Sequence, residues 1–324
     1  MQPADITQIG VIGAGTMGAG IAEVFAEAGY PVVWYNRSTA GLQRGLERIR
    51  ANQTTLIRHG VLTPSAADTA LSRLSPTTDI TALAAVEVIS ESLPEQLTVK
   101  QEVLQALERI CAPQAIITSN TSGLPISQIA TILASPARFA GMHFANPPHI
   151  IPMVEIVRGV ETAATTCEAL RLLVHRLGKY PVLVAHDVPG FIANRLQFAV
   201  LREALHLVET GVATPADIDA AMKHGIGLRW ALLGPLEIAD VGGLDVFHSI
   251  GAYLFQTLSN ATAMPPALAE LVAAGKLGAK SGAGFYEYAS DAVPRILADR
   301  DAKLLQLLRL KRQVEEPPGR ARST

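Results

Sequence analysis

The chain has 324 residues, more than one hydrophobic core usually serves, so two domains are expected. Its formal net charge of -2 at pH 7 leaves no broad basic field, which argues against a nucleic-acid partner or an anionic membrane surface. No apolar run reaches the ~18 residues of a membrane span, and residues 1–7 lack the basic start of a signal peptide, so a cytoplasmic location is expected. Cys111 and Cys167 lack disulfide or zinc spacing, and no metal is expected.

The first part of the chain alternates short apolar runs with segments of helical periodicity. A glycine-rich turn at residues 13–18 separates the first strand from a helix over residues 19–28, and a helical insertion is predicted at 41–74. Strands are predicted at residues 9–12, 31–35, 86–90, 115–119, 139–144, 153–157 and 181–185. This α/β alternation predicts a doubly wound, mainly parallel sheet with helices covering both of its faces.

The pattern changes after Asp187, where we place the domain boundary. Residues 1–187 form the predicted α/β domain, and residues 188–314 form a smaller all-α domain, which is expected to bind the substrate and to dimerise. The tail, 315–324, is rich in charge, proline and glycine and is predicted to be disordered. A helix at 191–209 is apolar on nearly every face, and leucines gather at 304–310. This apolar surface predicts a homodimer through the second domain, unless it packs against the first.

The glycine-rich turn is the first chemical signal. Gly13 permits the tight turn, Gly15 lets the backbone approach a pyrophosphate, and Gly18 allows close packing of the helix on the sheet. Thr16 and Met17 lie in the same turn, at a helix N-terminus whose N–H groups favour phosphate. Because the motif joins a strand to a helix, it predicts a dinucleotide site rather than a simple turn.

The end of the second strand bears on the choice of cofactor. NAD-binding folds usually place a carboxylate about 20 residues beyond the glycine turn, where it binds the ribose 2′-hydroxyl. This chain offers Asn36, Arg37 and Ser38 instead. A fork-shaped cation beside a hydroxyl suits a 2′-phosphate, so NADP is the predicted preference. The alternative is that Arg37 is solvated while Asn36 binds the plain diol of NAD.

Polar residues follow several later strands of the predicted sheet. The carboxyl ends of strands line the ligand crevice of an open α/β sheet, so Asn120 and Asn146 are assigned to the cofactor. His143 is the candidate base, because histidine is the side chain that ordinarily changes charge near working pH, and Glu155 is a candidate to hold its other ring nitrogen. Two further residues are candidates for holding the reacting oxygen, namely Ser122 and Asn194. Each of these four also has a structural interpretation, as a core histidine, a strand-edge ion pair, a helix cap or a buried amide.

With these residues in view, the chain resembles the 3-hydroxyacyl-CoA dehydrogenase family over nearly its whole length. The likeness is carried by GVIGAGTMGAGIA, SNTSGL, MHFANPP, VEIV, DVPGFIANRL and GKLGAKSGAGFYEY, in that order. The resemblance implies a Rossmann domain, a helical domain that commonly dimerises, and a His–Glu pair formed by His143 and Glu155. It also implies cofactor contacts from Glu95, Lys100 and Lys280.

The substrate is less defined, because the segment GIGLRWALLGPLE resembles family branches that act on small polar acids. These branches are L-gulonate 3-dehydrogenase with lambda-crystallin, carnitine dehydrogenase and a pyridine-carboxylate dehydrogenase of vitamin B6 breakdown. Arg229 offers a clamp for a free carboxylate, and Trp230 and His149 are further candidates for substrate binding. A CoA thioester would instead need cations at the rim, for which the inserted helices offer Arg44, Arg48, Arg50 and Arg58.

Three functions remain open from the sequence. The leading one is an NAD(P)-dependent dehydrogenase that transfers hydride at the 3-hydroxyl or 3-keto group of a hydroxy acid or its CoA thioester. The second is oxidation of an alcohol or aldehyde on a pyridine carboxylate. The third is a crystallin-like protein that binds NADPH without catalysis, although a structural role would not require all four candidate catalytic residues together.

Overall fold

The computed structural model describes residues 6–289 and 291–315. The chain divides into two compact units, Met1–Arg195 and Leu196–Thr324, each of which is described by itself. The first unit therefore extends beyond the boundary predicted after Asp187. The end of the predicted tail, residues 316–324, lies outside the described residues, whereas Glu315 is the last residue of a helix.

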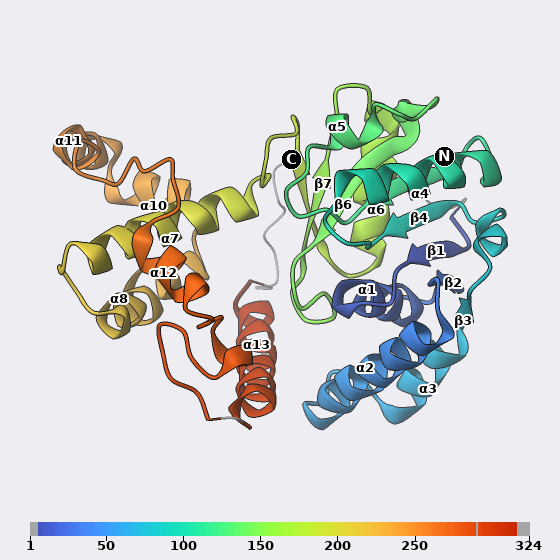
Figure 1. Ribbon diagram of the computed structural model, residues 1–324, viewed down its shortest axis with the longest axis horizontal. Coiled ribbons are helices and arrows are strands. Elements are labelled where there is room, and N and C mark those ends of the chain that lie inside the picture. Colours follow the sequence, from blue (N-terminus) through green and yellow to red (C-terminus); the bar gives the residue numbers. More distant parts are fainter. Residues whose placement is uncertain (1–5, 290, 316–324) are drawn as a thin grey trace. The chain divides into compact units, whose positions relative to one another are not determined.

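The first unit is built on an eight-stranded sheet with the order β3-β2-β1-β4-β5-β6-β7-β8 (Figure 1). The strands are β1 (Ile9–Ile12), β2 (Val32–Tyr35), β3 (Leu74–Thr77), β4 (Val88–Glu91), β5 (Ile116–Ser119), β6 (Phe139–Phe144), β7 (Met153–Val157) and β8 (Tyr180–Val184). Neighbouring strands are parallel except β6 and β7, whose antiparallel pairing sets His143 opposite Glu155. The mainly parallel, doubly wound sheet confirms the predicted fold class.

The strands alternate between two apolar cores, as expected of a sheet buried on both faces. Val11 and Trp34 belong to the core that includes the first helix, whereas Ile12 and Val33 belong to the other. The covering elements are α1 (Thr16–Glu27), α2 (Thr39–Arg58), α3 (Pro64–Ser72), η2 (Ile80–Leu83), α4 (Leu97–Ile110), α5 (Ile126–Ala130), η3 (Pro136–Arg138) and α6 (Ala164–Arg176).

Strand β3 is the one element of the sheet that the sequence did not predict. The helical insertion expected over residues 41–74 is present as α2 and α3, but Leu74 opens a strand. This strand reads Leu-Ser-Pro-Thr, and its proline removes a backbone donor, which is tolerated because β3 lies at the edge of the sheet. A short edge strand with a proline lacks the continuous apolar run from which the other strands were predicted.

The second unit is helical in its described part, as predicted. It contains most of α7 (Ala193–Glu209), followed by α8 (Pro215–Ala221), η4 (Met222–Ile226), α9 (Gly227–Trp230), α10 (Pro235–Gly242), α11 (Leu244–Leu254), α12 (Pro266–Ala273), η5 (Ala279–Ser281) and α13 (Ala292–Glu315). Within its described residues, Leu205 and Leu305 are the two buried apolar side chains. Leu196 and Phe198 of α7 are more than half exposed, at 54% and 56%. Among the residues described, no helix combines the length and apolar character needed to cross a bilayer.

Candidate active site

The glycine-rich turn joins β1 to α1 with the geometry of a phosphate-binding loop. Gly13 has a φ of 101°, and a Cβ there would lie 2.5 Å from the carbonyl oxygen of Ser92. A Cβ on Gly18 would collide with the carbonyl of Gly13, so only glycine allows this helix to pack so closely. Gly15 precedes α1 without a side-chain cap, and a Cβ there would meet nothing within 4 Å. The first N–H groups of α1 are therefore left for a ligand.

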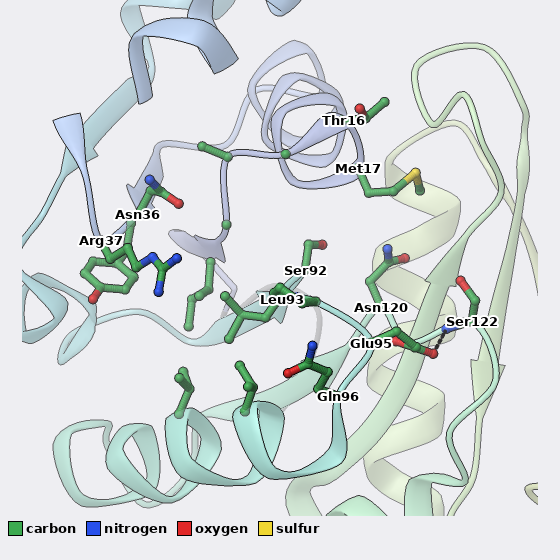
Figure 2. Close-up of a pocket in the computed structure, with 18 residues that line it drawn as sticks. Thr16, Met17, Asn36, Arg37, Ser92, Leu93, Glu95, Gln96, Asn120 and Ser122 are labelled. Carbon is green, nitrogen blue, oxygen red and sulfur yellow. Dashed lines mark hydrogen bonds between the residues drawn. The ribbon is translucent and has the colours of Figure 1, made fainter. Parts of the chain in front are cut away.

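A cavity of about 930 Å³ opens beside this turn, where the strand order reverses between β1 and β4. Figure 2 shows Asn36 and Arg37 at one end, and Glu95, Asn120 and Ser122 at the other. The cavity brings together these predicted residues with Gly13, Gly15, Thr16 and Met17. Sequence reasoning missed the segment after β4, which also lines the cavity with Ser92, Leu93, Pro94 and Gln96. The rule that strand ends line the crevice would have found it.

The amide of Asn36 has a fixed orientation at the edge of this cavity. Its Nδ2 donates to the carbonyl oxygen of Ser38 at 3.0 Å and to the Ser38 hydroxyl at 3.3 Å. Because a carbonyl oxygen can only accept a hydrogen bond, the amide nitrogen of Asn36 must face Ser38. The amide oxygen, Oδ1, is then the atom that remains available to a ligand. Ser38 caps α2 by accepting from the N–H of Gly41 and does not line the cavity. Asn36 therefore offers an acceptor, as the usual carboxylate would.

Lys100, predicted to contact the cofactor, is instead buried under the cavity. Its Nζ donates to Glu91 Oε1 at 2.9 Å and lies 3.4 Å from Glu95 Oε2, and 1% of its side chain is exposed. Glu95 accepts from the hydroxyl of Thr121 and from the N–H groups of Ser122 at 2.9 Å and Gly123 at 3.0 Å. Figure 2 shows the bond between Ser122 and Glu95.

This network, in which Lys100 is buried and Glu95 is partly exposed, holds the loop that carries Ser122. Although partial burial opposes it, the pKa of Glu95 is lowered by the hydrogen bond from Thr121, the charge of Lys100 and the two backbone donors. Glu91, which the sequence analysis did not single out, also accepts from Ser119 Oγ at 2.6 Å and is fully buried. Its place at the end of β4, next to the missed segment, is the signal that pointed to it.

The predicted His–Glu pair is formed. His143 Nδ1 lies 2.7 Å from Glu155 Oε2, and Glu155 is fully buried while His143 is 7% exposed. The other carboxylate oxygen, Oε1, accepts from the N–H groups of Ile192 and Ala193, both at 2.9 Å. Burial favours the neutral acid, but the hydrogen bonds from His143 and the two backbone donors outweigh it and lower the pKa of Glu155. Glu155 is thus held as a carboxylate that can orient the imidazole and stabilise its charged form.

The remaining candidate catalytic residues form a second pair. Asn194 Nδ2 donates to the carbonyl oxygen of Ser122 at 2.8 Å, which ties the start of α7 to the loop after β5. Asn120, on the same loop, accepts from the N–H of Phe144 at 2.8 Å, next to His143. The bond between Asn120 and Phe144 therefore links the loop of Ser122, to which Asn194 is bonded, to the strand that carries His143. The side chain of Asn194 contacts a backbone carbonyl here, so its predicted role at the substrate oxygen stays a prediction.

Other predicted residues do not line the described cavity. Asn146 is exposed and His149 is half-buried, and both lie in the loop between β6 and β7. Lys280, Arg229 and Trp230 belong to the second unit, so their assignments to cofactor and substrate remain predictions. No group of three or more metal-binding side chains was found among the described residues.

A dinucleotide loop, a cavity at the switch point of the sheet and a carboxylate-held histidine together define a nicotinamide-dependent dehydrogenase. The family model described as 3-hydroxyacyl-CoA dehydrogenase, NAD binding domain, matches residues 8–188, and that of the C-terminal domain matches residues 190–288. The chain belongs to the 3-hydroxyacyl-CoA dehydrogenase family and is an NAD-dependent oxidoreductase.

Two relatives illustrate the range of the family. The chain is 37% identical over 306 residues to 5-formyl-3-hydroxy-2-methylpyridine 4-carboxylate 5-dehydrogenase of Mesorhizobium japonicum, which covers 94% of this chain and 98% of the relative. It is 40% identical over 282 residues to a probable 3-hydroxybutyryl-CoA dehydrogenase of Deinococcus radiodurans, covering 87% of this chain and 100% of the relative.

Solved structures show the same contrast. A crystal structure of the pyridine-carboxylate dehydrogenase, described as an NAD+-dependent dismutase, matches with a TM-score of 0.89 and 37% identity, covering 95% of this chain and 99% of that chain. (S)-3-hydroxybutyryl-CoA dehydrogenase from Ralstonia eutropha matches with a TM-score of 0.74 and 36% identity, covering 88% of this chain and 100% of that chain.

Proposed function

We propose that the chain oxidises an alcohol or aldehyde group on a small carboxylated substrate, with NAD as the hydride acceptor and His143 as the base. The observation that carries this is the contact between His143 Nδ1 and Glu155 at 2.7 Å. With Nδ1 held by the carboxylate, Nε2 is the nitrogen left to accept the hydroxyl proton of the alcohol or the hydrated aldehyde. Bound NAD supplies the site that accepts the hydride.

The residues of the cavity fit a dinucleotide, with open N–H groups at α1 for the pyrophosphate and Asn36 for the adenosine ribose. The amide oxygen of Asn36 can accept a hydrogen bond from a ribose hydroxyl. The oxygens of a 2′-phosphate are themselves acceptors, so they would be repelled by this amide oxygen. This geometry supports NAD over the NADP preference expected from Arg37. In the NADP alternative, the Arg37 guanidinium at the cavity would bind the 2′-phosphate.

Measuring kcat/KM with each cofactor tests the choice. For the wild-type chain we expect higher kcat/KM with NAD, and Arg37→Ala should change this value by less than about threefold, because Arg37 would contact only solvent-exposed ribose. A wild-type preference for NADP that Arg37→Ala abolishes would establish the alternative.

The quality of the structural match supports a pyridine-carboxylate type of substrate: the TM-score is 0.89 over 95% of this chain for the pyridine-carboxylate dehydrogenase, against 0.67 over 94% for a 3-hydroxyacyl-CoA dehydrogenase from Archaeoglobus fulgidus. The Deinococcus 3-hydroxybutyryl-CoA dehydrogenase is matched over its whole length by 282 residues, and the C-terminal family model ends at residue 288. Helix α13 (Ala292–Glu315) lies beyond that point, whereas the alignment to the pyridine-carboxylate dehydrogenase extends over 306 residues. On α9, Arg229 and Trp230 are exposed and offer a cation for a carboxylate and an aromatic face for a ring.

A 3-hydroxyacyl-CoA thioester is the second candidate substrate, favoured by relatives such as the 38% identical probable 3-hydroxybutyryl-CoA dehydrogenase of Bacillus subtilis. The arginines expected to bind CoA phosphates are exposed on α2, namely Arg44, Arg48, Arg50 and Arg58. Of these, Arg48 donates to the carbonyl oxygen of Ala14 at 3.4 Å in the glycine-rich turn.

A substrate panel distinguishes these functions. It would contain 3-hydroxyacyl-CoAs, 3-hydroxy acids and pyridine carboxylates with hydroxymethyl or formyl groups, each with NAD and NADP. Products are measured by chromatography as well as by NADH absorbance, because an enzyme that oxidises one aldehyde while reducing another shows no net NADH. Activity confined to CoA thioesters would refute the free-carboxylate proposal. Absence of turnover with intact NAD binding would favour the crystallin-like, non-catalytic function.

The assembly and location are also proposals. A homodimer formed through the second unit is supported by its exposed apolar side chains, among them Leu196 and Phe198 at 54% and 56% exposure. A monomeric sedimentation profile at micromolar concentration would contradict it. The cytoplasmic location expected from the sequence stays a prediction, which cell fractionation would test.

A further inference from the structure

The turn that leads into α7 has an unusual backbone. Gly190 and Phe191 have consecutive left-handed conformations, with φ values of 78° and 53°. Phe191 is the one non-glycine residue with positive φ in the described part of the chain. Glycine adopts this conformation freely, but a bulky residue is strained in it. Such strain persists where the surroundings over-determine it, and it gathers at functional sites.

The turn directs two backbone donors at Glu155. The N–H groups of Ile192 and Ala193 each donate to Glu155 Oε1 at 2.9 Å, and α7 begins at Ala193. The first N–H groups of a helix need acceptors, which usually come from Ser, Thr, Asp or Asn just before the helix. Phe191 and Ile192 offer no such side chain. The carboxylate of β7 therefore caps α7 with one oxygen and holds His143 with the other.

The side chain of Phe191 contacts the other half of the pair. Its ring is 1% exposed and meets the imidazole of His143 edge to face, with ring centroids 5.7 Å apart and an interplanar angle of 62°. Glycine or asparagine would suit the backbone better at this position. Neither residue has an aromatic ring to contact the imidazole. The ring of Phe191 is therefore the property that explains a phenylalanine in this strained conformation.

We propose that Phe191 is a positioning residue for His143, which its ring and Glu155 together hold in one orientation. This inference rests on the proposed role of His143 as the base. Removing the ring frees the imidazole to rotate, and kcat should fall on the order of 10- to 100-fold. The KM for NAD should stay within about twofold, because the glycine-rich turn and Asn36 follow β1 and β2, which β4 and β5 separate from the strands of His143 and Glu155.

The test compares Phe191→Ala with Phe191→Gly. Both variants remove the ring, but only glycine relieves the left-handed strain, so the two should differ in unfolding free energy while losing kcat by a similar factor. Phe139→Ala is the matched control, because Phe139 is equally buried in the same apolar cluster and opens β6, the strand that carries His143 further along. It should lose stability with little change in kcat. If Phe191→Ala does not fold, Phe191→Leu replaces it.

A readout independent of turnover is the NMR signal of the His143 ring in the full chain, assigned with His143→Gln. In the wild type the Nδ1 proton bonded to Glu155 should be protected from exchange, and in both Phe191 variants it should exchange faster. Recovery of kcat in Phe191→Gly but not in Phe191→Ala would show that the backbone, and not the ring, matters. Equal loss of kcat in Phe139→Ala, or wild-type kcat and exchange in both Phe191 variants, would also overturn the inference. Full activity of His143→Gln would instead refute the proposed base.

Discussion

Lys100 provides a sharp test of the network beneath the cavity. Its Nζ contacts Glu91 Oε1 at 2.9 Å and the carbonyl oxygen of Leu93 at 3.3 Å, with side-chain exposures of 1% for Lys100 and 0% for Glu91. In Lys100→Met the apolar stem is largely kept, but Glu91 stays buried without its cation. The fully buried carboxylate then retains the hydroxyl of Ser119 and the N–H of Leu93 as donors.

The cost of this change follows from the burial of both partners. Removing one partner of a buried ion pair costs about 3–5 kcal/mol, because an uncompensated charge is left inside. At about 1.4 kcal/mol per factor of ten, the unfolding equilibrium constant should rise by about two to four orders of magnitude. For a unit of this size, about 2–4 °C per kcal/mol gives a fall in Tm of roughly 6–20 °C.

Urea and thermal unfolding of Lys100→Met measure this cost, with Glu91→Gln and the double variant completing a double-mutant cycle. The double variant should recover much of the lost stability, since no buried charge is left unpaired. The NAD dissociation constant should rise less than about tenfold, because Lys100 does not line the cavity. Unchanged stability together with a larger loss of NAD affinity would refute this reasoning and restore Lys100 as a direct cofactor contact.

Three other substitutions test separate parts of the structure. Glu155→Gln cannot stabilise a charged His143, so kcat at pH 7 should fall by about 10²–10⁴; a fall below tenfold would contradict the pair. Burial raises the pKa of Glu27 from 4.5 to about 7, so the free energy of unfolding of the wild type falls as the pH rises from about 4.5 to 7. Glu27→Gln lacks this ionisation, so by pH 8 its free energy of unfolding should exceed that of the wild type by up to about 3 kcal/mol more than at low pH, measured by urea unfolding. A difference between the two proteins that does not change with pH would contradict this. In Gly41→Ala the new Cβ would displace the Asn36 amide, raising the KM for NAD about two- to tenfold; an unchanged KM would argue against Asn36 as a ribose contact.

The fold class and the His–Glu pair were predictable because their signals are local or follow from sheet geometry. The glycines of the first turn, Gly13 and Gly18, sit between an apolar strand and a helix, and each is required by a close backbone approach. His143 and Glu155 each lie on a strand that the sequence predicts with its observed bounds, and the antiparallel register sets them opposite each other. The sequence predicted the strands, whereas their antiparallel order became visible only in the structure.

The direction of the Asn36 amide was not predictable, because it depends on a carbonyl two residues away and on the space left by Gly41. The burial of Lys100 was not predictable for a related reason. The family resemblance implied a cofactor contact for it, but the side chain turns toward Glu91, whose burial depends on the pairing of β4 with β1 and β5. Charge alone does not show whether a lysine faces a ligand or a carboxylate in the core.

The position of the boundary between the units follows from the same contacts that build the site. Residues beyond Asp187 are bound to the first unit: Phe191 is buried in its core, Ala193 donates to Glu155, and Asn194 donates to Ser122. These contacts bury an apolar side chain and pair hydrogen-bonding groups with protein partners. In a solvated linker the same groups would be exposed to water. The first compact unit therefore ends at Arg195, the third residue of α7. The same residues contact Glu155 and His143, so a change at residues 190–194 is expected to alter the proposed base as well as the start of α7.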